Sequence, residues 1–187
     1  MRCRASDRKT RKRPTLIAIG LLALVVFGAA ADAGESVLSN AVAPSLPTPE
    51  RMKPHIMGAL DAPVRVKLTA AFRLAAGRVR DIPGCASLFA NLGADGLVCL
   101  NTTMYRSVAD AGGDRVCRRG WGAAAFTGVG SPSTVLCPAL HGLTLEETAL
   151  VVLHEALHRA GLQEWPPTPG ALDSTAINRM VRGACGL

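Results

Sequence analysis

Apolar positions recur at helical spacing in two long segments of the chain. Across residues 66–81 the apolar side chains fall on one stripe, and most arginines fall off that stripe. A Pro-Gly pair at 83–84 ends this helix, and a short helical turn is expected at 88–90. The second segment, residues 145–160, is apolar over most of its surface, as a buried helix requires.

The helix over 145–160 has its own start and stop signals. Thr144 and Glu147 form a capping box, in which each side chain accepts a hydrogen bond from the backbone of the other residue. Gly161 then supplies the C-terminal stop. A shorter helix is expected after Asp173 or Ser174, both helix-capping residue types. Its apolar positions are Ile177, Met180 and Val181.

Short apolar stretches between Gly- and Pro-bearing turns predict strands. A turn is expected at 112–114, whereas residues 104–106 carry no pattern that assigns them. Together with the helices, these strands predict an α+β fold. The predicted strands are residues 97–100, 115–118, 123–127 and 134–137.

The first 33 residues have the layout of a secretory signal peptide. Seven basic residues lie within 2–13, and an almost wholly apolar run follows from Thr15 to Ala31. The sequence Ala31-Asp32-Ala33 offers a small-x-small cleavage site. Because the apolar run has 17 residues, the lower limit for a membrane span, an uncleaved N-terminal anchor is the alternative. We therefore expect an exported protein, secreted or periplasmic, or one anchored to the membrane by this segment.

The positive charge of the chain is concentrated in the same N-terminal segment. The whole sequence carries a formal net charge of +7. Residues 1–33 hold 7 of the 21 basic and 2 of the 14 acidic residues, so the remainder has a net charge of +2. The basic balance therefore reflects the export signal, and no nucleic-acid partner is expected.

The rest of the chain divides into a linker and one domain. Residues 34–64 hold five prolines with little periodicity, which indicates a Pro-rich linker. Residues 65–187 are long enough to bury one core. We see no internal repeat and no second domain.

Five cysteines follow the signal segment: Cys85, Cys99, Cys117, Cys137 and Cys185. Outside the cytoplasm most of them should form disulfides. None belongs to a C-x-x-C pair, which argues against a thiolate zinc site. We expect Cys117 to pair with Cys137, and Cys185 to pair with Cys85 or Cys99. The odd number leaves one cysteine free or paired between chains.

An H-E-x-x-H motif, formed by His154, Glu155 and His158, lies within the predicted 145–160 helix. A spacing of four residues puts both imidazoles on one helical face, so both can bind one metal ion. Neutral imidazole is a common zinc ligand, and catalytic zinc sites use three protein ligands and a water. Glu155 can take a proton from that water. The alternative is a pair of core histidines that hydrogen-bond to backbone carbonyls.

The motif and the residues after it resemble the zincin metallopeptidases. His154-Glu155-x-x-His158-x-x-Gly161-x-x-Glu164 is similar to the metzincin pattern, in which the glycine turns the chain and a third ligand follows. That ligand is usually His and here is Glu164; two His and one Glu are an established catalytic zinc set. The resemblance covers about a dozen residues. It implies a minimal, disulfide-stabilised zincin-like domain with a small mixed sheet packed on the metal-binding helix. This domain would bind Zn²⁺ through His154, His158 and Glu164.

Three further residues are candidates for roles at this site. Asp173 is the alternative third ligand, because Glu164 and Asp173 are the only carboxylates after His158. His141 and Tyr105 are candidate oxyanion stabilisers. The alternative for His141 is an exposed loop residue, and the alternative for Asp173 is a helix cap.

By this resemblance, the protein is expected to be an exported zinc-dependent peptidase that hydrolyses peptide bonds with a metal-activated water. A peptide or protein substrate would add to an edge strand of the sheet, either 123–127 or 134–137, unless both strands are internal. The alternative function is a non-catalytic zinc-binding domain that binds an extracytoplasmic protein or a cell-wall partner. A membrane-tethered protein with an incidental motif is a third alternative. A membrane contact is expected only if the N-terminal segment stays uncleaved.

Overall fold

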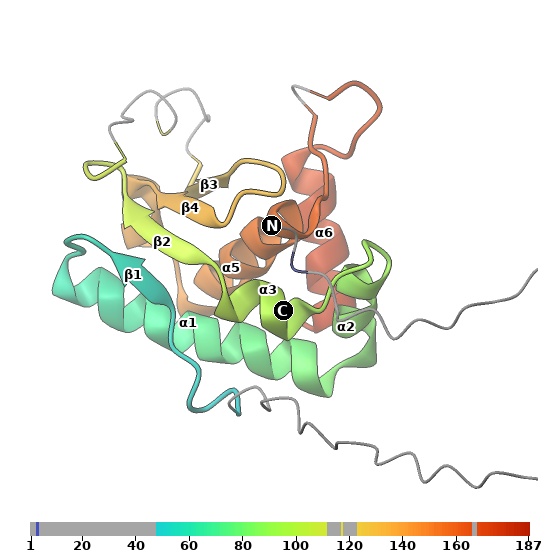
Figure 1. The fold of residues 1–187 in the computed structure, drawn as a ribbon, viewed down its shortest axis with the longest axis horizontal. Helices are drawn as coiled ribbons and strands as arrows, with labels where there is room; N and C mark the ends of the chain where they lie inside the picture. Colours follow the sequence, from blue (N-terminus) through green and yellow to red (C-terminus); the bar gives the residue numbers. More distant parts are fainter. Residues whose placement is uncertain (1–2, 4–47, 112–116, 118–122, 166–167) are drawn as a thin grey trace, which may run out of the picture. The chain divides into compact units, whose positions relative to one another are not determined.

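A computed structural model describes residue 3 and residues 48–111, 117, 123–165 and 168–187 (Figure 1). These residues form an α+β fold of five α-helices, one 3-10 helix and a four-stranded sheet. The segment on which the signal-peptide or anchor prediction rests lies outside the described residues, as do the predicted turn at 112–114 and most of the predicted strand at 115–118. Among the described helices, none is both long enough and apolar enough to cross a membrane.

The sheet has the strand order β1-β2-β4-β3, with β3 at one edge. Strands β1 (His55–Met57), β2 (Met104–Ser107) and β4 (Ser133–Leu136) run parallel, and β3 (Ala125–Thr127) is antiparallel to β4. The strands predicted at 123–127 and 134–137 are thus confirmed in β3 and β4. Of these two strands, only β3 lies at an edge of the sheet, because β4 lies between β2 and β3.

Helix α1 (Ala62–Asp81) buries the predicted apolar stripe and packs against α5 in the core. It begins four residues earlier than predicted, because Pro63 in the first turn is already fixed at a helical φ and has no N–H to leave unpaired. Strand β1 and the first turn of α1 therefore come from the predicted linker, and 34–64 is not linker throughout. After α1, helix α2 (Pro83–Ala90) contains the expected short helical turn.

Residues 97–100, predicted as a strand, are helical. They belong to α3 (Gly96–Asn101), which Asp95 caps by accepting a hydrogen bond from the Val98 amide at 3.0 Å. A four-residue apolar run fits a buried helical turn as well as a strand, and here the cap decides for the helix. The unassigned residues 104–106 form most of strand β2 instead.

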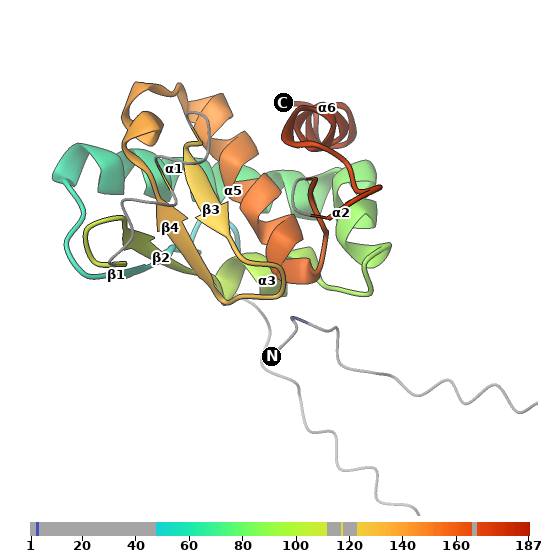
Figure 2. The same cartoon turned by 90° about the horizontal axis from the view of Figure 1, so that it is seen from above.

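Helix α5 (Leu145–Ala160) confirms the main helix prediction, including both its ends. The Thr144 amide donates to Glu147 Oε2 at 2.8 Å, and the Glu147 amide donates to Thr144 Oγ1 at 3.2 Å. Gly161 ends the helix at a φ of 116°, a conformation that residues with a Cβ rarely adopt. A 3-10 helix, η1 (Pro138–Gly142), precedes α5, and α6 (Ser174–Cys185) closes the chain beside it (Figure 2).

Three disulfides are present: Cys3–Cys99, Cys85–Cys185 and Cys117–Cys137. The predicted Cys117–Cys137 pair is confirmed, and Cys185 takes Cys85 of its two expected partners. The expectation of one unpaired cysteine is wrong for the full chain, because Cys3 of the predicted signal segment pairs with Cys99. A chain without residues 1–33 would leave Cys99 without this partner. Three disulfides are compatible with an extracytoplasmic protein.

Candidate metal centre

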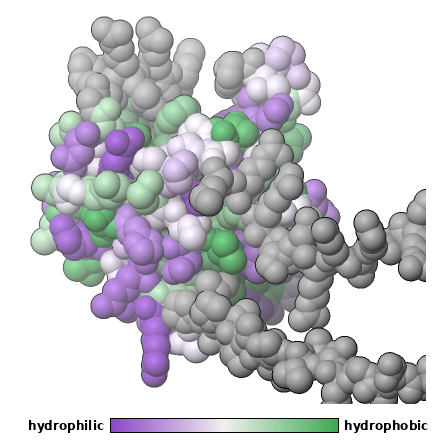
Figure 3. All heavy atoms as spheres, in the orientation of Figure 1, coloured by the Kyte–Doolittle hydropathy of each residue, from purple (hydrophilic) through white to green (hydrophobic). Residues whose placement is uncertain are grey.

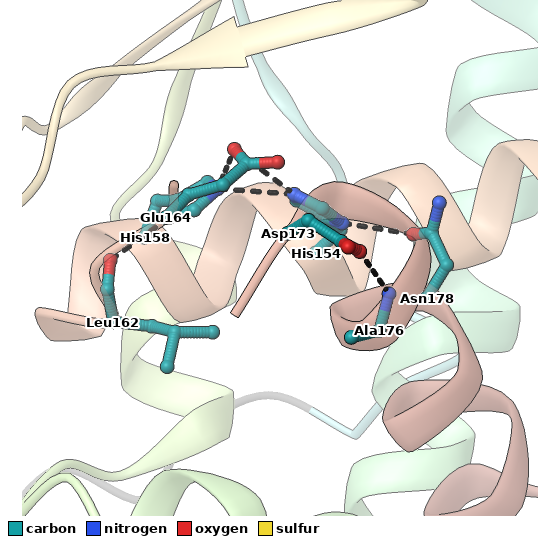
Figure 4. Close-up of polar contacts among 7 residues, drawn as sticks. All are labelled: His154, His158, Leu162, Glu164, Asp173, Ala176 and Asn178. Carbon is teal, nitrogen blue, oxygen red and sulfur yellow. Dashed lines mark hydrogen bonds and ion pairs between the residues drawn. The ribbon is translucent and has the colours of Figure 1, made fainter. Parts of the chain in front are cut away.

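Two histidines and one glutamate converge at the C-terminal half of α5 (Figure 4). The Nε2 atoms of His154 and His158 lie 3.0 Å apart. The Oε2 atom of Glu164 lies 3.1 Å from His158 Nε2 and 3.8 Å from His154 Nε2. All three ligand atoms lie within 4.8 Å of one another, so the group could hold a metal ion.

Both imidazole rings are oriented by a partner on their other nitrogen. The Nδ1 atom of His158 lies 2.9 Å from the carbonyl oxygen of Leu162, which can only accept a hydrogen bond. The Nδ1 atom of His154 lies 2.8 Å from Oδ1 of Asn178 on α6. Each Nδ1 is therefore the donor, and in a neutral imidazole the Nε2 atom then carries a lone pair.

This orientation places three acceptor atoms face to face. With both imidazoles neutral, the two Nε2 atoms and Glu164 Oε2 hold no proton among them, and their lone pairs repel. A cation between these atoms removes the repulsion, and nitrogen with carboxylate oxygen is a donor set that divalent metals accept. The residues present thus fit a metal ion.

The chain after α5 is folded back by local backbone hydrogen bonds. The amides of Gly161 and Leu162 donate to the carbonyl of Leu157 at 3.1 and 2.9 Å, which reverses the chain at the end of the helix. Glu164 then forms an isolated parallel bridge with Leu172, and the Trp165 amide donates to the Leu172 carbonyl at 2.9 Å. These contacts hold the Glu164 carboxylate at the imidazoles.

Glu155 faces the sheet from the same helix and is only 5% exposed. Its Oε2 atom is buried and has no hydrogen-bond partner among the described residues, whereas most buried polar atoms have one. Burial raises the pKa of Glu155, although the charges of His154 and His158 and the side chain of Thr127 act in the opposite direction. Thr127 lies on the edge strand β3, which packs against α5, so Glu155 lies near this edge of the sheet.

The ligand residues also shift one another's ionisation. Burial alone would lower the pKa of His154, but the Glu164 carboxylate, the Glu155 charge and Asn178 outweigh it and raise that pKa. Burial would raise the pKa of Glu164, yet His154 and His158 hold it below its usual range. The metal-free group therefore favours a charged His154 beside an ionised Glu164.

The other predicted site residues lie in different surroundings. Asp173 caps α6, where its Oδ1 accepts from the Ala176 amide at 2.7 Å, as the helix-cap alternative expected. His141 is exposed and lies in η1, 3.8 Å from Asp61. It precedes α5, whereas His154 lies roughly 14 Å further along that helix, measured from Leu145.

Tyr105 is in the core on β2, 1% exposed, with its ring edge-on to Phe72 at 6.2 Å. Its hydroxyl is buried and has no hydrogen-bond partner among the described residues, and burial raises its pKa. The structure thus groups His154, His158 and Glu164, and it does not bring Asp173, His141 or Tyr105 into that group of ligand atoms.

Sequence reasoning missed Asn178 and Thr127. The only signal for Asn178 was its residue type, since asparagine is a poor helix former within an otherwise regular α6. Thr127 had no signal, because its proximity to Glu155 depends on how β3 packs on α5.

A scan against protein-family models, a search of curated proteins and a search of solved structures each returned no match. Function is therefore inferred from the chemistry of the site itself.

Proposed function

We propose that this protein is an exported zinc-dependent peptidase with a zincin-like domain. The observation that carries the proposal is the arrangement of one helix and its return loop. Three potential ligand atoms, from His154, His158 and Glu164, lie within 4.8 Å of one another, and the buried carboxyl of Glu155 belongs to the same helix as the two histidines. Two imidazoles and one carboxylate are an established ligand set for catalytic zinc, which favours zinc over metals that prefer all-oxygen sites.

Zinc in this site would supply a Lewis acid that polarises a peptide carbonyl and lowers the pKa of a water molecule. Glu155 would accept a proton from the attacking water and pass it to the leaving amine. A general base works best when its pKa approaches the working pH, and burial shifts the pKa of Glu155 in that direction. The unpartnered Oε2 of Glu155 is the oxygen that is free to take this proton.

Strand β3 would align the substrate. As an edge strand it leaves one row of backbone N–H and C=O groups unpaired among the described residues. A peptide in extended conformation pairs with such an edge, and its carbonyls are then held in fixed register. Because the side chain of Thr127 on β3 is near enough to lower the pKa of Glu155, this register would bring a peptide bond close to the proton acceptor.

The test combines metal analysis with one conservative substitution. The purified chain should carry about one zinc and should cleave members of a broad peptide library. Glu155→Gln keeps the shape of the side chain but cannot accept the proton, so zinc should be retained while cleavage falls by at least about 100-fold. Glu146→Gln, an exposed glutamate on the same helix, is the matched control and should leave both unchanged. Absence of zinc from the purified, refolded chain would contradict the proposal.

A non-catalytic zinc-binding domain that binds an extracytoplasmic protein or cell-wall partner is the alternative. The burial of Glu155 favours it, since a general base has to reach the water it deprotonates. This alternative predicts bound zinc and no cleavage of any library peptide by the unmodified chain. The same experiment therefore separates the two functions.

A further inference from the structure

Exposed apolar side chains are concentrated beside the metal centre. Of the seven large apolar residues that are exposed among the described residues, four lie in two segments next to it. Phe126 and Val129, 49% and 54% exposed, belong to β3 and the turn after it. Trp165 and Leu172, 52% and 44% exposed, belong to the loop after Glu164. Figure 3, in the orientation of Figure 1, shows hydrophilic and hydrophobic residues interspersed over the described part of this face.

Both segments are tied to the ligand residues by short contacts. The Gly130 amide, in the turn after β3, donates to the carbonyl oxygen of His158 at 2.8 Å. Trp165 directly follows Glu164, and its amide bonds to Leu172 at 2.9 Å. Figures 1 and 2 place β3 on one side of α5 and the segment leading into α6 on the other. The two segments that carry these exposed apolar residues thus lie on either side of the helix that holds the two histidines.

The hydrogen-bond pattern of β3 shows which groups an added strand would meet. The Cys137 amide donates to the carbonyl of Ala124, and Phe126 is opposite Val135 in the same register. Because pairs alternate in an antiparallel ladder, the N–H and C=O groups of Ala125 and Thr127 point away from β4. Side chains alternate too, so buried Thr127 faces α5 and exposed Phe126 faces the other side of the sheet.

We propose that the substrate is an extended peptide with large apolar side chains on both sides of the bond to be cut. A peptide paired with Ala125 and Thr127 places one side chain against Phe126, with Val129 next along the chain. Beyond the metal centre, a second side chain packs against Trp165 and Leu172. Each contact removes apolar surface of both partners from water, which favours Leu, Phe or Met over small polar residues. This inference rests on the proposed peptidase function and adds its substrate class.

Binding to an inactive protein tests the substrate class separately from catalysis. Zinc-loaded Glu155→Gln chain is titrated against two fluorescent ten-residue peptides that differ only at the two central positions, Leu-Phe in one and Ser-Ser in the other. Fluorescence anisotropy should give at least about tenfold tighter binding of the Leu-Phe peptide. Adding Trp165→Ala should weaken binding of the Leu-Phe peptide by about tenfold and leave the Ser-Ser peptide unchanged. Trp165→Phe should restore most of the preference.

Two controls make the result specific. Val66→Ala shortens an exposed apolar side chain on α1 and should change neither affinity. Phe126→Ser is a second variant, in the other apolar segment. If Trp165→Ala loses zinc, the same binding comparison is made with Phe126→Ser. Equal affinities for both peptides, or an equal loss for both on Trp165→Ala, would overturn the apolar substrate class.

The two proposals fail in different ways. If the unmodified zinc-loaded chain cleaves library peptides without apolar residues at the cut bond, the substrate class is wrong and the peptidase function stands. If it cleaves no peptide and the Glu155→Gln chain binds neither probe, both proposals are wrong. Cleavage sites mapped by mass spectrometry should otherwise show large apolar residues on both sides of the cut.

Discussion

The Nδ1 atom of His154 lies 2.8 Å from the Oδ1 atom of Asn178, and this contact joins the metal centre to the C-terminal helix. The two residues come from α5 and α6, 24 positions apart in the chain. The Cys85–Cys185 disulfide links the end of α6 to α2. A side chain that orients a ligand ring is thus carried by a helix that is itself covalently fixed.

Asn178→Ala should weaken zinc binding by roughly 10- to 100-fold, because it removes the acceptor that orients the His154 ring. Asn178→Asp should preserve binding, since a carboxylate accepts the same hydrogen bond. Chelator competition measures both affinities. Thr175→Ala, an exposed position of the same helix, is the control and should change nothing. Equal zinc affinity in Asn178→Ala and the unmodified chain would show that the contact does not support the metal.

The ligand set predicts a graded series of zinc contents. His154→Ala and His158→Ala should each abolish stoichiometric zinc, because two remaining ligands hold the ion poorly. Glu164→Ala should lower both zinc affinity and peptide cleavage, whereas Glu164→His should retain zinc through the added imidazole. Metal analysis by mass spectrometry checks each variant.

Asp173→Asn is the comparison that separates the two carboxylates. It should keep zinc and cost about 1 kcal/mol of unfolding free energy or less, because asparagine caps helices about as well as aspartate. Loss of zinc in Asp173→Asn with zinc kept in Glu164→Ala would move the third ligand to Asp173.

The disulfide pattern predicts a thiol count that depends on the N-terminus. The oxidised full chain should show no free thiol on alkylation under denaturing conditions, since all six cysteines are paired. A chain from which residues 1–33 have been removed should show one, on Cys99. Peptide mapping by mass spectrometry identifies the labelled residue. A free thiol on Cys85 or Cys185 in the shortened chain would contradict the pairing.

The pKa shifts predict that raising the pH changes the thermal stability of the metal-free and the zinc-loaded protein in opposite directions. The pKa of His154 is raised on folding, so its contribution to stability is full below the unfolded value, about 6.5, and is lost as pH rises through the folded value. The pKa of Glu155 is also raised, so its ionisation costs stability over the range above about 4.3. Metal-free protein should therefore unfold at lower temperature at pH 8 than at pH 6.

Zinc should reverse this order, because it binds the deprotonated imidazoles and competes with protons for them. The lowered pKa of Glu164 acts only at acid pH, where its contribution is lost as pH falls below about 4.3. Thermal unfolding with and without zinc at both pH values checks the reversal. In metal-free Glu155→Gln the fall between pH 6 and pH 8 should be smaller, because the Glu155 charge is one of the causes that raise the pKa of His154.

Local sequence patterns were enough to predict helix α5, most of α1 and the spacing of the two histidines on α5. Thr144, Glu147 and Gly161 define the ends of this helix through bonds to near neighbours, so they can be recognised without a fold. The positions of His154 and His158 on one face follow from helical periodicity alone. The apolar stripe of α1 could also be predicted from the sequence, because a helix with one buried face has apolar residues at helical spacing.

The pairing of segments that are distant in the chain could be seen only in the folded protein. The apolar run at residues 97–100 is compatible with a strand or a helix. In the folded protein it is helical, with Asp95 as its cap and Cys99 buried in the core. The prolines of 48–64 indicated a linker, so strand β1 was not predicted. Its pairing partner, β2, lies almost 50 residues later in the chain. Asn178 reaches His154, Thr127 reaches Glu155, and Cys3 reaches Cys99 because packing of the whole chain brings them together. Such contacts leave no local pattern, because their free energy is gained only once elements far apart in the chain have docked.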